Sequence, residues 1–387
     1  MRPEPAALPP ALRGQDTMNR IFLLLCLVAL APAAWAQKPP MEIPRDDALV
    51  IERLPAGYVS PPARDTAPSL EQVRALMAAA SRNGDARLAS RAEALLPRLA
   101  RTQPAETIWL LQAYAAQHRH DFAGALAVLD RLLARHPADA DARHLRAQIH
   151  LVGGRLDRAK QDCTALALGI DSRRARLCFA ALAERRHDTR QGIALLTRWL
   201  SQASATDPSR TYALTLRAEF ASMQSAGDAD RWFRQALAAQ PQHVGTLAAY
   251  ARHLRRNGEF AQAWDLLRDA PDADRLLLEQ ALLARALNRP DAGALARRLQ
   301  QRYRLAHAVG AAPEAREEAE FALSLGGDAP RALQLAQTNF ATQRDREDVE
   351  LFCRAAIAAG ETQTLQSLRR WAASQQLLPT DDGCPRA

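Results

Sequence analysis

The stretch HDFAGALAVLDRLLARHP, residues 120–137, has the pattern of an amphipathic helix that recurs along the chain. Phe122, Ala125 and Leu129 are spaced by three and four residues, which places them on one helical face. The stretch GRLDRAKQDCTALALG, residues 154–169, has Leu156, Ala159 and Cys163 at the same three positions, each 34 residues later. A fixed period of this length is typical of a repeat architecture.

Each unit of this period is predicted to be a pair of helices. In the clearest copy Trp109 lies early in the first helix, and Ala113 is a small residue where two backbones approach closely. Pro137 ends the second helix, because proline cannot continue a helix and disfavours helical conformation before it. The period returns further along, where Ala229 and Ala263 are again 34 residues apart.

These residues resemble the tetratricopeptide repeat family. The resemblance implies an all-α fold, a right-handed α-solenoid of about nine helical hairpins over residues 69–378, with a concave groove. The match is strongest in residues 106–139, 210–243 and 244–273, and the other copies are degenerate. The prominent aromatic residues are interpreted as packing residues of the repeats: Trp109, Phe122, Phe233 and Phe260.

The composition agrees with a helical chain. Hydrophobic residues make up 48% of the sequence but aromatic residues only 5%, which favours packed helices over strands. The net charge is +8, but it is scattered, and lysine occurs only at Lys38 and Lys160. With no dense basic block and no series of stacking aromatics, nucleic acid is not expected as a partner.

The segment MNRIFLLLCLVALAPAAWAQ, residues 18–37, has the features of a secretory signal peptide. We therefore expect residues 1–36 to be a signal segment whose true start is Met18 and whose cleavage follows Ala36, and an uncleaved anchor is the alternative. Residues 37–68 are rich in proline and are expected to form an extended arm. We therefore expect a periplasmic or secreted location. Residues 316–348 resemble a recurring signature of exported bacterial tetratricopeptide proteins without assigned biochemistry.

Four cysteines remain after the signal segment. In an oxidising compartment an even number favours pairing, although four cysteines allow three connectivities. Sequence order favours Cys163 with Cys178 and Cys353 with Cys384, and the alternative is that some of them are small buried apolar residues. Residues 379–387 are expected to form a short C-terminal tail, so no catalytic domain is expected after the solenoid.

The sequence contains no phosphate-binding loop, dinucleotide fingerprint, nucleophile elbow or zinc-protease motif. We therefore expect no catalytic residue, no cofactor and no resident metal. His118, His120 and Asp121 have spacing that could hold a metal, but a polar solvated turn is the commoner arrangement. The dense carboxylates Glu317, Glu318 and Glu320 are attributed to the favourable interaction of acids with a helix N-terminus.

In the family, the first helix of each hairpin lines the groove. Transferring that geometry gives ten candidate ligand-binding residues: Leu110, Tyr114, His118, His144, Gln148, Arg252, Arg256, Glu317, Phe321 and Arg354. Arginine beside apolar residues suits peptide recognition, whereas the lysine and asparagine set of the family's carboxylate clamp is absent. The expected function is a non-enzymatic exported scaffold that binds a protein or peptide partner. The alternative is an assembly component of an envelope polysaccharide-export or secretion machine, and the oligomeric state is left open.

Overall fold

The computed structural model describes residues 68–224, 227–308 and 314–375 together with Cys384. The expected signal segment 1–36 lies outside the described residues, as do the arm 37–68 except its last residue and the tail 379–387 except Cys384. Within the described ranges the chain forms eighteen α-helices and no strand. The helices run from Leu70 to Ser374, inside the range expected for the solenoid.

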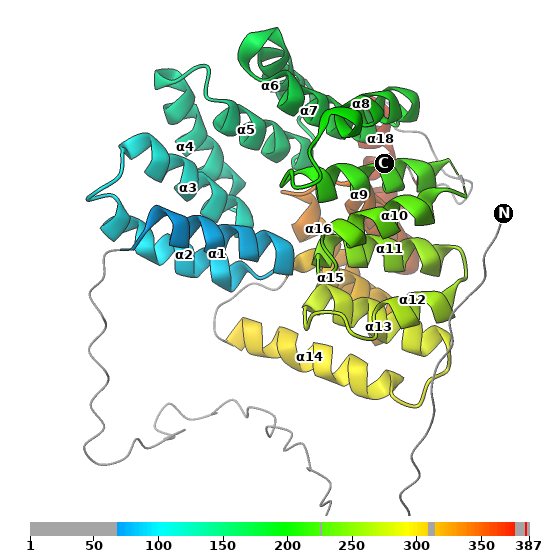
Figure 1. Ribbon diagram of the computed structural model, residues 1–387. Helices are drawn as coiled ribbons and strands as arrows, with labels where there is room; N and C mark the ends of the chain where they lie inside the picture. The colour runs from blue at the N-terminus through cyan, green and yellow to red at the C-terminus, as the bar shows by residue number, and fades with distance from the viewer. Residues whose placement is uncertain (1–67, 225–226, 309–313, 376–383, 385–387) are drawn as a thin grey trace, which may run out of the picture. The chain divides into compact units, whose positions relative to one another are not determined.

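The helices form nine consecutive antiparallel hairpins, and successive hairpins pack side by side (Figure 1). The prediction of an all-α solenoid of about nine hairpins is therefore confirmed. Two short π-helical turns, η1 (Leu166–Ile170) and η2 (Ala322–Gly326), follow α6 and α15. The hairpins are α1 (Leu70–Asn83) with α2 (Ala86–Leu99), α3 (Ala105–His118) with α4 (Phe122–Arg135), α5 (Ala140–Val152) with α6 (Leu156–Ala165), α7 (Ser172–Arg185) with α8 (Thr189–Gln202), α9 (Arg210–Met223) with α10 (Ala229–Ala239), α11 (Val244–Arg256) with α12 (Phe260–Leu266), α13 (Asp274–Ala286) with α14 (Ala292–Ala308), α15 (Ala315–Phe321) with α16 (Ala329–Phe340), and α17 (Arg346–Ala358) with α18 (Thr362–Ser374).

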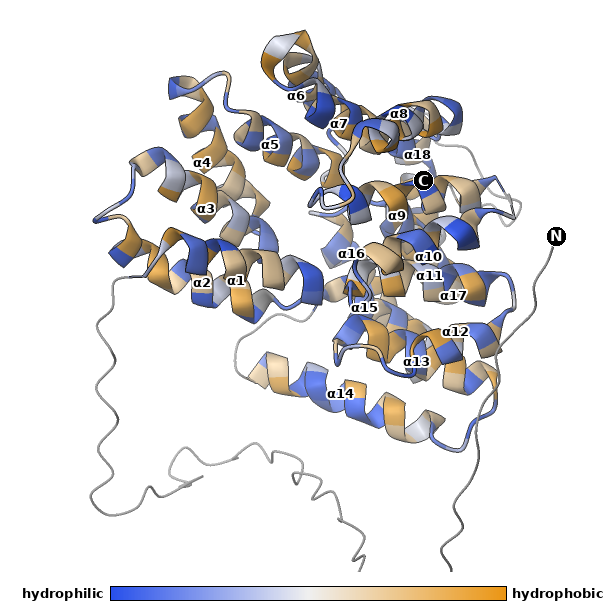
Figure 2. Cartoon of the chain, in the orientation of Figure 1, coloured by the Kyte–Doolittle hydropathy of each residue, from blue (hydrophilic) through white to orange (hydrophobic). Residues whose placement is uncertain are grey.

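The core between the helices contains the residues that set the sequence period. Phe122 is 7% exposed, and Ala125 and Leu129 are fully buried. Phe233 is also buried, and its ring stacks on Tyr250 with 4.9 Å between the centroids. Figure 2 shows hydrophobic and hydrophilic residues interspersed along the labelled helices, as expected when each helix buries one face.

The turns between paired helices use short polar caps and left-handed backbone. The Asp121 carboxylate accepts a hydrogen bond from the Gly124 backbone N–H, which caps the start of α4. Gly154 and Gly258 have φ values of +70° and +78°, a region that glycine enters without steric cost. His120 occupies the equivalent place before α4 with φ of +60°. The local sequence thus determines where each first helix ends.

The solenoid brings its C-terminal hairpins back against its N-terminal ones. The segment 341–345, between α16 and α17, lies across the ends of earlier hairpins. The Arg344 backbone N–H donates to the Val152 carbonyl at 2.8 Å, and the Gln343 side chain bonds His120 at 2.7 Å. Helix ends and turns of the early repeats are therefore in contact with the chain's own late repeats.

The cysteines lie in the two pairs expected from sequence order. Cys163 and Cys178 are joined with an S–S distance of 2.01 Å, which links α6 to α7 around η1. Cys353 on α17 is joined to Cys384 with an S–S distance of 2.07 Å. Among the described residues no helix combines the length and the apolar character needed to span a bilayer.

Candidate functional site: a charged cavity on the concave face

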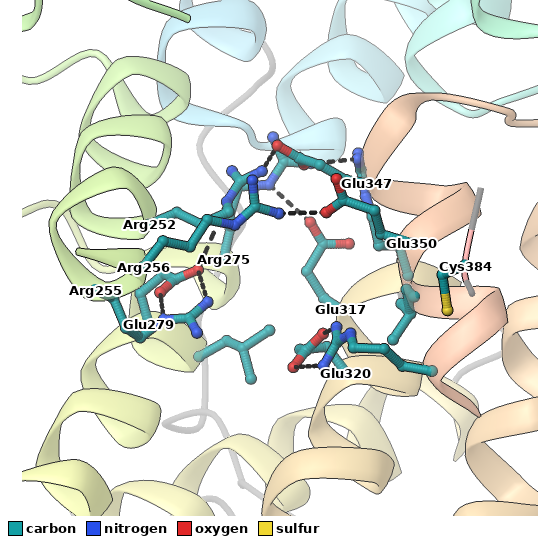
Figure 3. A pocket seen from close by; sticks show the side chains of 14 residues that line it. Arg252, Arg255, Arg256, Arg275, Glu279, Glu317, Glu320, Glu347, Glu350 and Cys384 are labelled. Atoms are coloured by element: carbon teal, nitrogen blue, oxygen red, sulfur yellow. Dashed lines mark hydrogen bonds and ion pairs between the residues drawn. The ribbon is translucent and has the colours of Figure 1, made fainter. Parts of the chain in front are cut away.

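A cavity of about 590 Å³ lies among the first helices of four successive hairpins, α11, α13, α15 and α17 (Figure 3). Its volume falls within the range of small-molecule pockets. Charged side chains dominate its wall, with two leucines and Cys384 completing it. The charged residues are Arg252, Arg255, Arg256, Arg275, Arg316 and Arg354, and Glu279, Glu317, Glu320, Glu347 and Glu350.

The upper part of the cavity in Figure 3 joins α11 to α17. Arg252 and Arg256, one turn apart on α11, form ion pairs with Glu347 and Glu350 on α17. Arg256 and Glu350 are separated by 94 residues in the sequence. The arginine row of one repeat therefore meets the carboxylate row of another that is three hairpins further along.

In the lower part of the cavity, arginines and glutamates of different helices also form pairs. Arg255 donates to Glu279 at 2.8 Å, and Arg354 pairs with Glu320. Arg275 on α13 donates through Nε to Glu317 Oε1 at 2.7 Å. On the cavity side the helices are thus joined by charge-assisted hydrogen bonds, in addition to the apolar clusters that α11 shares with α13 and α15 shares with α17.

The field inside the cavity is positive around Glu317. Burial by itself raises the pKa of Glu317, but the guanidinium groups of Arg275 and Arg316 outweigh it and lower this pKa to about 2. Burial lowers the pKa of Arg252 to about 10, and although Glu279 opposes this shift, three neighbouring arginines reinforce it. At neutral pH both groups are therefore charged, and Arg252 is in a crowded cationic environment.

One oxygen of this cavity has no donor. Glu317 is 5% exposed, and its Oε2 lacks a hydrogen-bond partner among the residues that the structure describes. Figure 3 shows its carboxylate projecting into the space between the side chains of α11 and those of α17. An ionised oxygen without a donor in a buried place is costly, so the position favours occupation by a donor group.

A comparison with protein-family models identifies the repeat pattern in one part of the chain. A model described as tetratricopeptide repeat matches residues 116–166, which spans α4, α5, α6 and the turns between them. Residues 116–166 thus carry the tetratricopeptide repeat pattern. No curated protein sequence matches it.

Several solved structures are similar to this chain. A structure reported for the functional characterisation of Pseudomonas aeruginosa pilF is 20% identical, covers 51% of this chain and 92% of its own, and has a TM-score of 0.40. A Parabacteroides merdae tetratricopeptide repeat protein is 15% identical with a TM-score of 0.38, and covers 65% of this chain and 98% of its own. Yeast Tom70 is 16% identical with a TM-score of 0.40, and the match covers 79% of this chain and 61% of Tom70. TM-scores at this level transfer neither a partner nor a function.

Four of the ten residues predicted to line the groove meet in the cavity: Arg252, Arg256, Glu317 and Arg354. Phe321 does not line it. Its ring packs edge-on against Tyr303 of α14, with 5.7 Å between the centroids. The first-helix rule therefore chose four residues that share one cavity, whereas Phe321 packs between helices.

The other five predicted residues lie on α3 and α5, away from the cavity wall. Leu110 packs against the core between α3 and α4. Burial raises the pKa of Tyr114 to about 12 and lowers that of His144 to about 4, so both are neutral at pH 7. His118 bonds Ser81 on α1 at 3.2 Å, and Gln148 is half-buried on α5.

The sequence interpretation missed most of the cavity's acidic wall. Glu350 and Glu347 lie one and two turns before Arg354 on the same face of α17, so helical spacing from Arg354 could have identified them. The attribution of Glu317 and Glu320 to helix electrostatics was incomplete, because both pair with arginines of other helices.

The polar turn with metal-compatible spacing has other contacts. His120 lies 3.4 Å from Glu314 as well as beside Gln343, and Asp121 caps α4. In the part of the chain that the structure describes, no group of three or more histidine, cysteine, aspartate or glutamate side chains is arranged to hold a metal ion.

Proposed function

We propose that this chain is a non-enzymatic, exported scaffold that binds a protein or peptide partner through its concave face. The observation that carries the proposal is the charged cavity that four successive first helices build. Tetratricopeptide repeat folds are in general used for protein–protein interaction, and concave faces of solenoids are their usual binding surfaces.

The chemistry of the cavity suits a peptide better than an apolar ligand. Guanidinium groups bind carboxylates and backbone carbonyls with directed hydrogen bonds, and carboxylates accept from backbone N–H groups and from basic side chains. Arg256 and Arg354 are 42% and 46% exposed, so both keep donors that a partner can reach.

Export is supported by the signal-like segment 18–37 and by two cysteine pairs, since disulfides persist in oxidising compartments. Cell fractionation of the full chain with a C-terminal tag tests this part. Recovery of a shortened chain in the periplasm or the medium is expected, and full-length protein in the cytoplasm would contradict export.

The partner is sought by affinity capture from periplasmic extract under non-reducing conditions. The cavity variant is Arg256→Gln with Arg354→Gln, which removes two charges but keeps a polar, though shorter, side chain at each position. The matched control is Arg190→Gln with Arg198→Gln on α8, where both arginines are exposed and neither lines the cavity.

We expect wild type and control to recover the same partner and the cavity variant to recover at least about tenfold less, because each lost charged contact is worth about 1.5–3 kcal/mol. Circular dichroism and thermal melting must show that all three proteins are folded. Equal recovery by the folded cavity variant would rule out this surface.

A further inference from the structure

The Arg275–Glu317 pair presents donors and an acceptor side by side. Arg275 uses its Nε for the bond to Glu317 Oε1, and no other hydrogen bond of this guanidinium is found among the described residues. Its side chain is 38% exposed, which leaves both terminal nitrogens available to the cavity. Glu317 keeps its second oxygen free beside them. A guanidinium with two free terminal nitrogens is shaped for a carboxylate, and a free carboxylate oxygen is suited to an ammonium group.

We propose that this cavity binds the zwitterionic head of an α-amino acid, with its carboxylate on Arg275 and its ammonium on Glu317 Oε2. In an α-amino acid one carbon separates the two charged groups, which matches a guanidinium and a carboxylate that are already in contact. The cavity of about 590 Å³ has room for the side chain beyond this head. Its wall of paired arginines and glutamates offers partners of either sign to that side chain.

A simple anion or a simple cation fits this site less well. An anion could bind Arg275 but would leave the buried Glu317 oxygen without a donor and would lie beside its negative charge. A bare amine would satisfy Glu317 but would lie beside Arg275, and Arg316 is close enough to influence the same carboxylate. A zwitterion brings one opposite charge to each member of the pair, so it adds no net charge to a buried place.

The test uses the mature chain with its disulfides intact. The standard α-amino acids are screened at about 10 mM by thermal shift, and the one that raises the melting temperature most is measured by calorimetry. Its N-acetyl derivative, which lacks the ammonium, and its amide, which lacks the carboxylate, are measured in parallel. We expect each blocked form to bind at least about tenfold more weakly, since each lacks one charge-assisted interaction.

A variant locates the site. Glu317→Gln should remove the preference for the free amino acid over its N-acetyl form, while Glu71→Gln, on the exposed face of α1, should leave the preference unchanged. If Glu317→Gln does not fold, the comparison of blocked ligands with wild type decides alone. The proposal is overturned if no amino acid raises the melting temperature, if the blocked forms bind equally well, or if folded Glu317→Gln keeps the full preference.

This inference concerns the same cavity as the proposed partner site, but it does not require a protein partner. Amino-acid binding without partner capture would retain this inference and refute the scaffold proposal. Capture without amino-acid binding would do the reverse.

Discussion

Gly192 provides a prediction in which the structure and the repeat pattern disagree. It is the fourth residue of α8, a position that Ala125 and Ala159 occupy in α4 and α6. The pattern alone therefore predicts that Gly192→Ala is stabilising, since alanine is favoured over glycine in a helix by about 1 kcal/mol. In the structure a Cβ at this position would lie 2.0 Å from Cζ of Phe220, whose ring is fully buried.

The ring has little room to yield. All three ring atoms nearest to the added Cβ lie within 2.7 Å of it, so the whole ring must shift in a packed core. Overpacking of this kind costs about 1–3 kcal/mol, which exceeds the gain in helix propensity. We expect Gly192→Ala to lower the free energy of unfolding by about 1–2 kcal/mol.

Urea unfolding followed by circular dichroism measures the effect, with Gly293→Ala on α14 as the control. A Cβ at Gly293 meets one end of a flexible arginine at 3.2 Å, so this substitution should be neutral or stabilising by up to about 1 kcal/mol. Combining Gly192→Ala with Phe220→Leu removes the clashing ring and should recover about 1–2 kcal/mol relative to the sum of the single changes. The packing argument would be refuted if Gly192→Ala were stabilising, or if the free-energy changes of Gly192→Ala and Phe220→Leu simply added in the double variant.

Three further changes test other parts of the molecule. Replacing Cys163 and Cys178 by alanine opens a loop with a sequence separation of 15 residues and should lower the urea midpoint by the equivalent of about 3 kcal/mol, and an unchanged midpoint would show that the bond contributes nothing. Burial and a neighbouring glutamate raise the pKa of Glu219 from 4.5 to about 7, so the folded chain holds a proton there that the unfolded chain has lost. The free energy of unfolding should therefore fall as the pH rises between these values, and Glu219→Gln should flatten that fall, whereas parallel pH profiles would contradict the shift. Asp162 is 1% exposed and accepts hydrogen bonds from two arginines, so Asp162→Ala should lower the free energy of unfolding by about 2–3 kcal/mol. Asp157→Ala, on the exposed face of the same helix, should lower it by less than about 0.5 kcal/mol. Equal melting temperatures for the two variants would argue against a structural role for the buried carboxylate.

The sequence predicted those features that depend on local order. The three-and-four spacing of Phe122, Ala125 and Leu129 predicts a buried helical face, and these residues are buried. The contact between Arg256 and Glu350 had no such signal, because nothing in a 34-residue period specifies which residues meet 94 positions apart. That contact depends on small rotations between successive hairpins, which accumulate along the solenoid.

The same long-range contacts hold the late hairpins together and form the wall of the candidate binding site. Arg252 and Arg256 hold α17 against α11, so reversing their charge would place two anions opposite Glu347 and Glu350 and would separate the hairpins. Loss of binding in such a variant would report on folding and not on recognition. Neutral replacements at the more exposed arginines avoid that repulsion.

The pairing also limits what the cavity can accept. Each buried charge is stabilised by its partner, and a ligand that displaces one member leaves the other without compensation. A ligand therefore binds at low cost only where the network has a vacancy that already needs a partner. Within the described part of the cavity that place is the second oxygen of Glu317, next to the free nitrogens of Arg275. Affinity should consequently depend on the cationic group of the ligand at least as strongly as on its anionic group, although arginine is the most abundant residue in the cavity wall.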